Sequence, residues 1–66
     1  MTRKLDVSIE NHGSLMLFRL RTKAAREFVD ENVSADAQML GNALAVEPRY
    51  ARDLAQGMIE AGLAVL

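Results

Sequence analysis

The segment GNALAVEPRYARDLAQGM, residues 41–58, constrains the possible folds more than any other part of this chain. It can form a short strand over 43–46 followed by a helix beginning at Pro48, where the missing N–H of proline costs nothing. It can also be the second half of a helix-turn-helix. That alternative needs Gly41 and Asn42 near the middle of a helix, where both are poor helix formers and where such a pair more often marks a bend. We therefore predict a strand followed by a helix.

The alternative, a winged helix-turn-helix regulator, would use the helix after Pro48 to read the major groove of DNA. Because neutralisation of phosphates supplies much of the affinity for DNA, such a helix is expected to be basic. This helix and its flanks instead hold more acidic than basic residues, so we do not expect direct binding to nucleic acid. The residues of the alternative interface are Arg49, Tyr50, Arg52 and Gln56.

Residues 5–20 have the pattern of a β-hairpin. Apolar and polar residues alternate through the first half, as in a half-buried strand, and the letters NHGS that follow are typical of a turn. With the turn at the centre of NHGS, the register places Val7 opposite Phe18 and Asp6 opposite Arg19. The second strand, LMLFRL, is apolar on both faces over four residues, which predicts a position inside the sheet.

Two helices are predicted. The first covers residues 23 to about 32, with Thr22 as its N-cap. The second begins at Pro48 and ends before Gly62, which suits the left-handed conformation that terminates helices. Gly57 costs about 1 kcal/mol relative to alanine inside a helix, so we interpret it as permitting close approach of another element. The final letters, LAVL, predict a short strand. Apolar residues at helical spacing predict two buried faces. The first consists of Ala24, Ala25, Phe28 and Val29, with Val33 just beyond the first helix, and the second consists of Ala51, Leu54, Ala55, Met58 and Ile59.

The length and composition limit the class of protein. Sixty-six residues cannot build a second core, so residues 1–66 are predicted to form a single α+β domain. We expect an N-terminal β-hairpin and two helices packed on one face of a mixed sheet, in a ββαβαβ-like order. No apolar segment is long enough to cross a bilayer, and the N-terminus lacks the apolar core of a signal peptide. These features predict a soluble, cytoplasmic protein that does not associate with membranes.

No combination of residues indicates a reaction. The chain has no cysteine and a single histidine, His12, which cannot form a metal cluster by itself. The serines lack a nucleophile-elbow motif, and the four glycines are too scattered for a phosphate-binding loop. We therefore predict a protein that is not an enzyme, with no catalytic residues, no cofactor and no metal.

Charge is distributed unevenly along the sequence. Residues 1–26 hold six basic residues against two acidic ones, and residues 27–66 hold two basic residues against seven acidic ones. The basic set (Arg3, Lys4, Arg19, Arg21, Lys23 and Arg26) could hold a nucleic acid backbone, although its only aromatic neighbour is Phe18, which the pattern buries. The acidic set could form a negative face that meets a basic groove and competes with nucleic acid for it, or it could be an ordinary solvated surface. The residues that we expect to contact a protein partner are Glu27, Asp30, Glu31, Asp36 and Asp53.

The block from about residue 14 to residue 66 resembles a group of short proteobacterial proteins carried by phages and other mobile elements. The markers of this resemblance are AARE, DAQ, and EPRY followed by DL, GM and GL. In size, in lacking cysteine and in lacking catalytic motifs, the chain is also similar to type I anti-CRISPR proteins. The resemblance implies a noncatalytic inhibitor or accessory protein whose partner is a host defence or effector complex. We expect it to act as a monomer or a weak homodimer.

Overall fold

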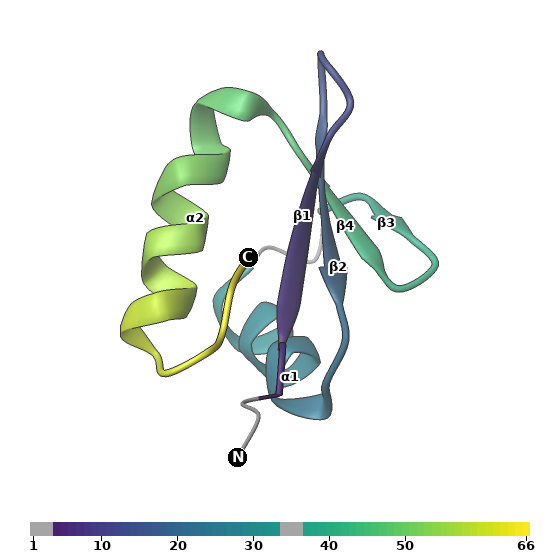
Figure 1. Cartoon of the computed structure of the whole chain (residues 1–66). Coiled ribbons are helices and arrows are strands. Elements are labelled where there is room, and N and C mark those ends of the chain that lie inside the picture. Colours follow the sequence, from purple (N-terminus) through teal and green to yellow (C-terminus); the bar gives the residue numbers. More distant parts are fainter. Residues whose placement is uncertain (1–3, 34–36) are drawn as a thin grey trace.

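A four-stranded antiparallel sheet, in the order β1-β2-β4-β3, organises the fold. The structure is a computed structural model, and it describes residues 4–33 and 37–66. Along the chain the elements are β1 (Val7–Asn11), β2 (Met16–Leu20), α1 (Lys23–Asn32), β3 (Met39–Leu40), β4 (Ala43–Val46) and α2 (Pro48–Glu60) (Figure 1). The predicted α+β class and N-terminal hairpin are confirmed, and β2 lies inside the sheet between β1 and β4, as its apolar faces predicted.

The register of the hairpin differs by two residues from the predicted one. Val7 pairs with Leu20, and Phe18 pairs with Ile9. Successive side chains of a strand alternate between the two faces of the sheet, so a shift by two residues keeps each side chain on its predicted face. Val7 and Phe18 are therefore both fully buried on the core side although they are not direct partners.

The turn explains this shift. It is centred on Gly13 and Ser14, one residue later than predicted, and the His12 N–H donates to the Leu15 carbonyl at 2.8 Å. The side-chain carbonyl of Asn11 accepts a hydrogen bond from the Gly13 N–H at 2.8 Å, and Gly13 has a φ of 79°. An asparagine that bonds the backbone two residues ahead stabilises a turn by itself, so the side chain of Asn11 favours this position of the turn.

The segment from β4 to α2 adopts the predicted strand and helix. β4 pairs with β2 along its whole length, α2 begins at Pro48, and Gly62 follows the helix with a φ of 94°. Because Met39–Leu40 and Ala43–Val46 are strands, no helix occupies residues 39–46. The helix-turn-helix interpretation of the fold is therefore wrong.

The N-cap of α1 is also confirmed. Thr22 has an extended backbone, and its Oγ1 accepts a hydrogen bond from the Ala25 N–H at 3.2 Å. Ala25 and Val29 are buried, but Ala24 is exposed, so the prediction for Ala24 is wrong. One residue corresponds to about 100° around a helix, which turns Ala24 away from the line of Ala25 and Val29.

Residues 64–66 run alongside β1 in the parallel direction. Val65 forms a parallel bridge with Val7, the Ile9 N–H donates to the Leu66 carbonyl at 2.9 Å, and the Leu66 N–H donates to the Val7 carbonyl at 3.0 Å. The predicted final strand thus exists as a short bridged segment that pairs in parallel, whereas the four strands of the sheet pair antiparallel.

Asp6 does not lie opposite Arg19, so the predicted pairing of these two residues is wrong. In the observed register Ser8 is the partner of Arg19. The carboxylate of Asp6 accepts hydrogen bonds from the Thr22 hydroxyl at 2.7 Å and from the Ala64 N–H at 2.8 Å. Asp6 therefore links the start of the hairpin, the start of α1 and the C-terminal segment.

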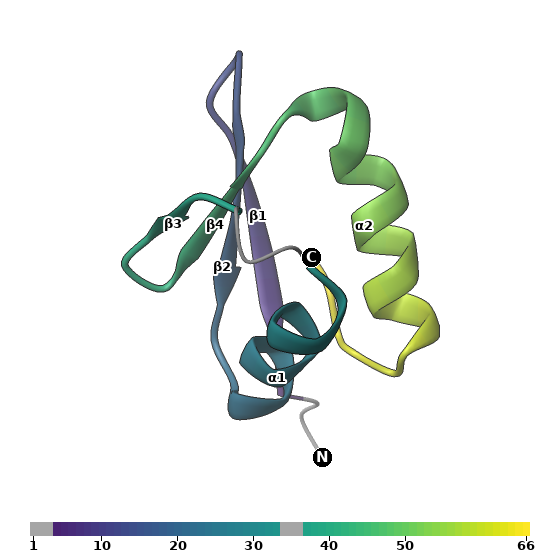
Figure 2. The ribbon, with the colours of Figure 1, turned by 180° about the vertical axis from the view of Figure 1, so that it is seen from behind.

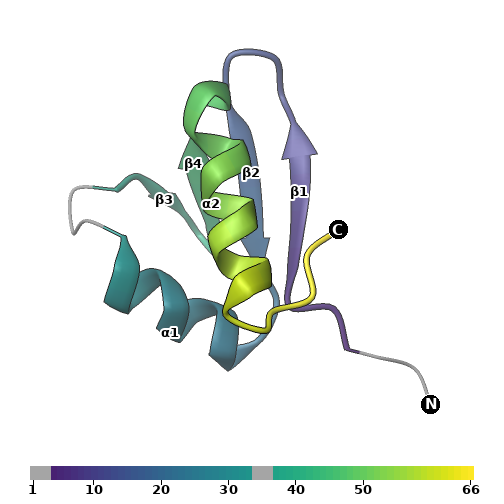
Figure 3. The same cartoon turned by 90° about the vertical axis from the view of Figure 1, so that its left-hand side faces the viewer.

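Both helices contribute to one core on the same face of the sheet. α2 lies over β2 and β4, and α1 lies at the lower end of the sheet (Figure 3). On the opposite face no helix of the described chain covers the sheet (Figures 1 and 2).

Ile59 is 52% exposed, so its predicted burial is wrong: the buried stripe of α2 is centred on Ala51 and Met58, and Ile59 lies about 100° beyond Met58. The core consists of Val7, Phe18, Leu20, Ala25, Val29, Leu44, Ala51, Met58 and Leu63.

Candidate functional site

Three of the five predicted partner-binding residues lie together on the outer surface of α1. Glu27, Asp30 and Glu31 are all exposed, and residues spaced by three and four positions share one face of a helix. Within the described residues none of the three forms an ion pair, and the last turn of α1 carries no basic residue. We call Glu27, Asp30 and Glu31 the acidic face.

The other two predicted residues are not part of this face. Asp53 is exposed on α2, a separate helix. Asp36 lies outside the described residues. The structure therefore brings together the acidic residues of α1 and leaves Asp53 apart from them in the fold.

Two residues of the alternative DNA-reading surface, Arg49 and Gln56, interact with nearby acidic residues, and Arg52 forms no ion pair within the described residues. The guanidinium of Arg49 contacts the Glu47 carboxylate at 3.3 Å and lies over the ring of Tyr50, 4.9 Å from its centre. Gln56 donates a hydrogen bond to Glu60 at 3.3 Å. Positive and negative groups are thus mixed along this helix, as they are along α1, where Lys23 and Arg26 precede the acidic face.

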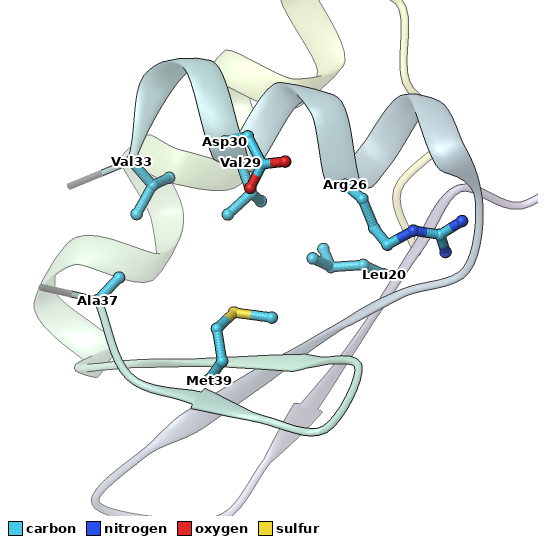
Figure 4. Close-up of a pocket in the computed structure, with 7 residues that line it drawn as sticks. All are labelled: Leu20, Arg26, Val29, Asp30, Val33, Ala37 and Met39. Carbon is cyan, nitrogen blue, oxygen red and sulfur yellow. The ribbon is translucent and has the colours of Figure 1, made fainter. Parts of the chain in front are cut away.

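A cleft separates α1 from the hairpin formed by β3 and β4. It has a volume of about 330 Å³, and the apolar side chains that line it point into the space between helix and hairpin (Figure 4). Two charged residues of α1, Arg26 and Asp30, stand at its margin. We call this space the apolar cleft; its apolar lining is Leu20, Val29, Val33, Ala37 and Met39.

A second depression of about 310 Å³ adjoins the apolar cleft and has a polar lining. It is formed by Arg19, Arg21, Arg26 and Asn42 around Leu20, and we call it the arginine depression. The two spaces share Leu20 and Arg26 as a common wall. Of the basic residues noted in the sequence, three are thus brought together; Lys4 and Lys23 are exposed but do not line this space, and Arg3 lies outside the described residues.

The charges on the hairpin are partly paired. The guanidinium of Arg19 donates two hydrogen bonds to the Glu10 carboxylate, one from Nε to Oε2 and one from Nη2 to Oε1, and the His12 ring lies 3.1 Å from the same carboxylate. The hydrogen bond from Arg19 and, secondarily, that from His12 lower the pKa of Glu10 from its ordinary value of 4.5 to about 2. Glu10 in turn raises the pKa of Arg19. This group was missed in the sequence because the predicted register placed Asp6, and not Glu10, beside Arg19.

Within the described residues, histidine and carboxylate side chains do not gather in a group of three that could hold a metal ion. Neither helix of that part of the chain combines the length and apolarity needed to span a bilayer. In comparisons with protein-family models, curated proteins and solved structures, nothing matched this chain. The resemblance to short phage-borne proteins therefore stays a prediction.

Proposed function

We propose that this protein is a noncatalytic binding protein that docks through its acidic face on an arginine- or lysine-rich surface of a larger partner. The observation that carries the proposal is the grouping of Glu27, Asp30 and Glu31, exposed and without cationic partners among the described residues, on one side of α1. An exposed cluster of one sign of charge steers association with a complementary surface and discriminates against other partners.

The position of these carboxylates is unfavourable for the isolated domain. Glu27 and Glu31 are spaced by four residues, so their like charges repel by a few tenths of a kcal/mol. Asp30 and Glu31 lie in the last turn of α1, where the negative end of the helix dipole disfavours further negative charge. A basic partner would relieve both effects, which supports a binding role for this surface.

The partner class that we propose is a host nucleoprotein effector, as the resemblance to type I anti-CRISPR proteins implies. The nucleic-acid groove of such a complex is basic, because it must neutralise phosphates. A carboxylate-rich helix that occupies the groove would compete with the nucleic acid. The protein would then act as an inhibitor without any chemical step.

Charge reversal on α1 tests this proposal. The triple variant Glu27→Lys, Asp30→Lys, Glu31→Lys should fold, because all three side chains are exposed, and it should capture far less of a nucleoprotein effector from host lysate than the parent protein does. Glu60→Lys, an exposed charge reversal on α2, is the matched control and should capture as much as the parent. Added nucleic acid should reduce the capture by the parent protein.

Two further outcomes define the site and the function. Asp53→Lys is compared with a variant that reverses the charge of one residue of the acidic face. If both weaken the capture equally, the docking surface extends to α2. If the triple variant captures the effector as well as the parent, the acidic face is not the binding site. Direct binding to generic duplex DNA, with a Kd of about 10⁻⁵ M and a steep dependence on salt, would contradict the proposed inhibitor.

A further inference from the structure

The space between α1 and the β3–β4 hairpin changes its chemical character from one end to the other. At one end, the side chains of Val29, Val33 and Met39 point into the apolar cleft (Figure 4). At the other end, the lining consists of Arg19, Arg21, Arg26 and Asn42 together with Leu20. Leu20, which is only 2% exposed, belongs to both parts, so the apolar and cationic regions meet at one wall.

The arginines of this space have unused hydrogen-bonding capacity. Arg26 forms no ion pair within the described residues. Arg21 donates from Nε to the Ser8 hydroxyl at 3.0 Å, which orients its guanidinium and leaves its terminal nitrogens for another acceptor. Arg19 is already partly neutralised by Glu10. A guanidinium fork matches the geometry of a carboxylate, so Arg21 and Arg26 are the main candidates for binding an anion.

We propose that this cleft binds a small amphiphilic anion, an aliphatic chain that ends in a carboxylate. The chain would lie along Val29, Val33 and Met39, and the carboxylate would lie between Arg21 and Arg26. Asp30 sets the orientation of the ligand. It borders the apolar cleft one helical turn from Arg26, so its carboxylate repels a ligand that is bound with its anionic head in the apolar cleft. A volume of a few hundred Å³ is at the small end of the range for ligand pockets, which suits a short chain.

A small ligand fits these residues better than a nucleic acid does. A polyanion that reached Arg26 would extend along α1 toward the carboxylates of the acidic face. Among the residues that the structure describes, no aromatic side chain lines either part of the cleft, so bases would have no stacking surface there. This proposal is independent of the docking of the acidic face on a protein, because its ligand and its lining differ, although Asp30 borders both.

Titration with octanoate, followed by NMR of the whole chain, tests the proposal. Octanoate should bind saturably with a Kd on the order of 1 mM, the range expected for a ligand of about ten heavy atoms. It should shift the methyl signals of Leu20, Val29 and Met39 together with the side-chain Nε signals of Arg21 and Arg26. Octan-1-ol, which lacks the charge, and acetate, which lacks the chain, should each bind at least tenfold more weakly.

Three exposed-residue variants and one control define the site. Arg21→Gln and Arg26→Gln should each weaken octanoate binding about fivefold, as expected for the loss of one charge-assisted hydrogen bond, and Asp30→Asn should tighten it. Arg52→Gln, on the outer surface of α2, should leave the affinity unchanged.

Equal affinity for octan-1-ol would overturn the anion subsite, equal affinity for acetate would overturn the apolar subsite, and no saturable shift in the cleft would overturn the whole proposal. None of these results depends on a protein partner, so they are separate from the test of the acidic face.

Discussion

At the scale of single residues, Gly57 is informative because it lies inside α2 and faces the ring of Phe28. The sequence suggested that a glycine here permits a close approach of another element. A Cβ atom built on Gly57 would lie 3.9 Å from Cζ of Phe28, an ordinary van der Waals distance. The site therefore has room for a methyl group, and packing does not require glycine.

Gly57→Ala should stabilise the protein. Alanine is favoured over glycine inside a helix by about 1 kcal/mol, which corresponds to a rise in Tm of roughly 4–8 °C for a domain of this size. Thermal unfolding followed by circular dichroism measures the change. Gly62→Ala is the contrasting variant and should lower Tm, because Gly62 has a φ of 94° that disfavours a Cβ atom. A lower Tm for Gly57→Ala would mean that Phe28 cannot accommodate the methyl group.

Glu10 should make stability depend on pH in the acid range. Because its pKa falls from 4.5 to about 2 on folding, its contribution is complete above pH 4.5 and is lost as the pH drops toward 2. The free energy of unfolding of the parent protein should thus exceed that of Glu10→Gln near neutral pH, and this difference should vanish near pH 2. The Glu10 side chain is 40% exposed, so added salt should reduce the difference.

A direct titration of the Glu10 carboxyl carbon by NMR provides the check on this effect. A midpoint near the ordinary value of 4.5, in place of about 2, would show that Arg19 and His12 do not hold the carboxylate in solution. Arg21→Gln, which removes a neighbouring arginine that does not contact Glu10, should leave the midpoint close to that of the parent.

At the scale of elements, α1 depends on Thr22 in two ways. Its hydroxyl oxygen accepts a hydrogen bond from the Ala25 N–H, and its hydroxyl group donates to Asp6 at 2.7 Å. Thr22→Ala should lower the free energy of unfolding by about 1–2 kcal/mol, near the upper end for an N-cap, as measured by urea denaturation. Thr22→Ser preserves the hydroxyl and should lose much less. If serine and alanine are equally destabilising, the lost methyl group, and not the cap, is responsible.

The boundaries of the elements were predictable because their signals are local. Thr22 and Pro48 mark the starts of the two helices, and Gly62 marks the end of the second. The hairpin register was not predictable in the same way. The sequence pattern allows a turn with Gly13 as its second central residue, which was predicted, and a turn with Gly13 as its first central residue, which is observed. The hydrogen bond from the Gly13 N–H to the Asn11 side chain accompanies the observed choice.

At the scale of the whole molecule, the fold is closed by a contact between residues near opposite ends of the sequence. The two oxygens of the Asp6 carboxylate accept from different segments, Oδ1 from the Thr22 hydroxyl and Oδ2 from the Ala64 N–H. The backbone of Asp6 adds bonds to the Ala64 carbonyl and the Arg21 N–H. Asp6 therefore links three segments that are far apart in the sequence.

Asp6→Asn should destabilise the protein globally. Asparagine has one acceptor oxygen where the carboxylate uses two, so one donor loses its partner at a cost of about 1–3 kcal/mol. Denaturation monitored at both the hairpin and α1 should show one shared transition at lower denaturant concentration. Asp53→Asn, an exposed change of the same chemistry, should stay within about 0.5 kcal/mol of the parent. Separate transitions for the hairpin and α1 would show that Asp6 does not couple them.

The candidate sites were only partly predictable for a related reason. The acidic face follows from the spacing of Glu27, Asp30 and Glu31 on one helix, and the sequence alone shows that spacing. The arginine depression requires Asn42 to lie beside β2, where the Asn42 carbonyl accepts from the Leu20 N–H at 2.9 Å. That contact depends on the pairing of β2 with β4, and a linear pattern does not show which strands pair.

The two edges of the sheet differ in what limits further strand pairing. The outer edge of β1 is occupied by residues 64–66, and β3 at the other edge has only two residues. A long free strand is the usual template on which identical chains stack into fibres. Neither margin of the described sheet is such a strand, because the C-terminal segment pairs with one and the other is only two residues long.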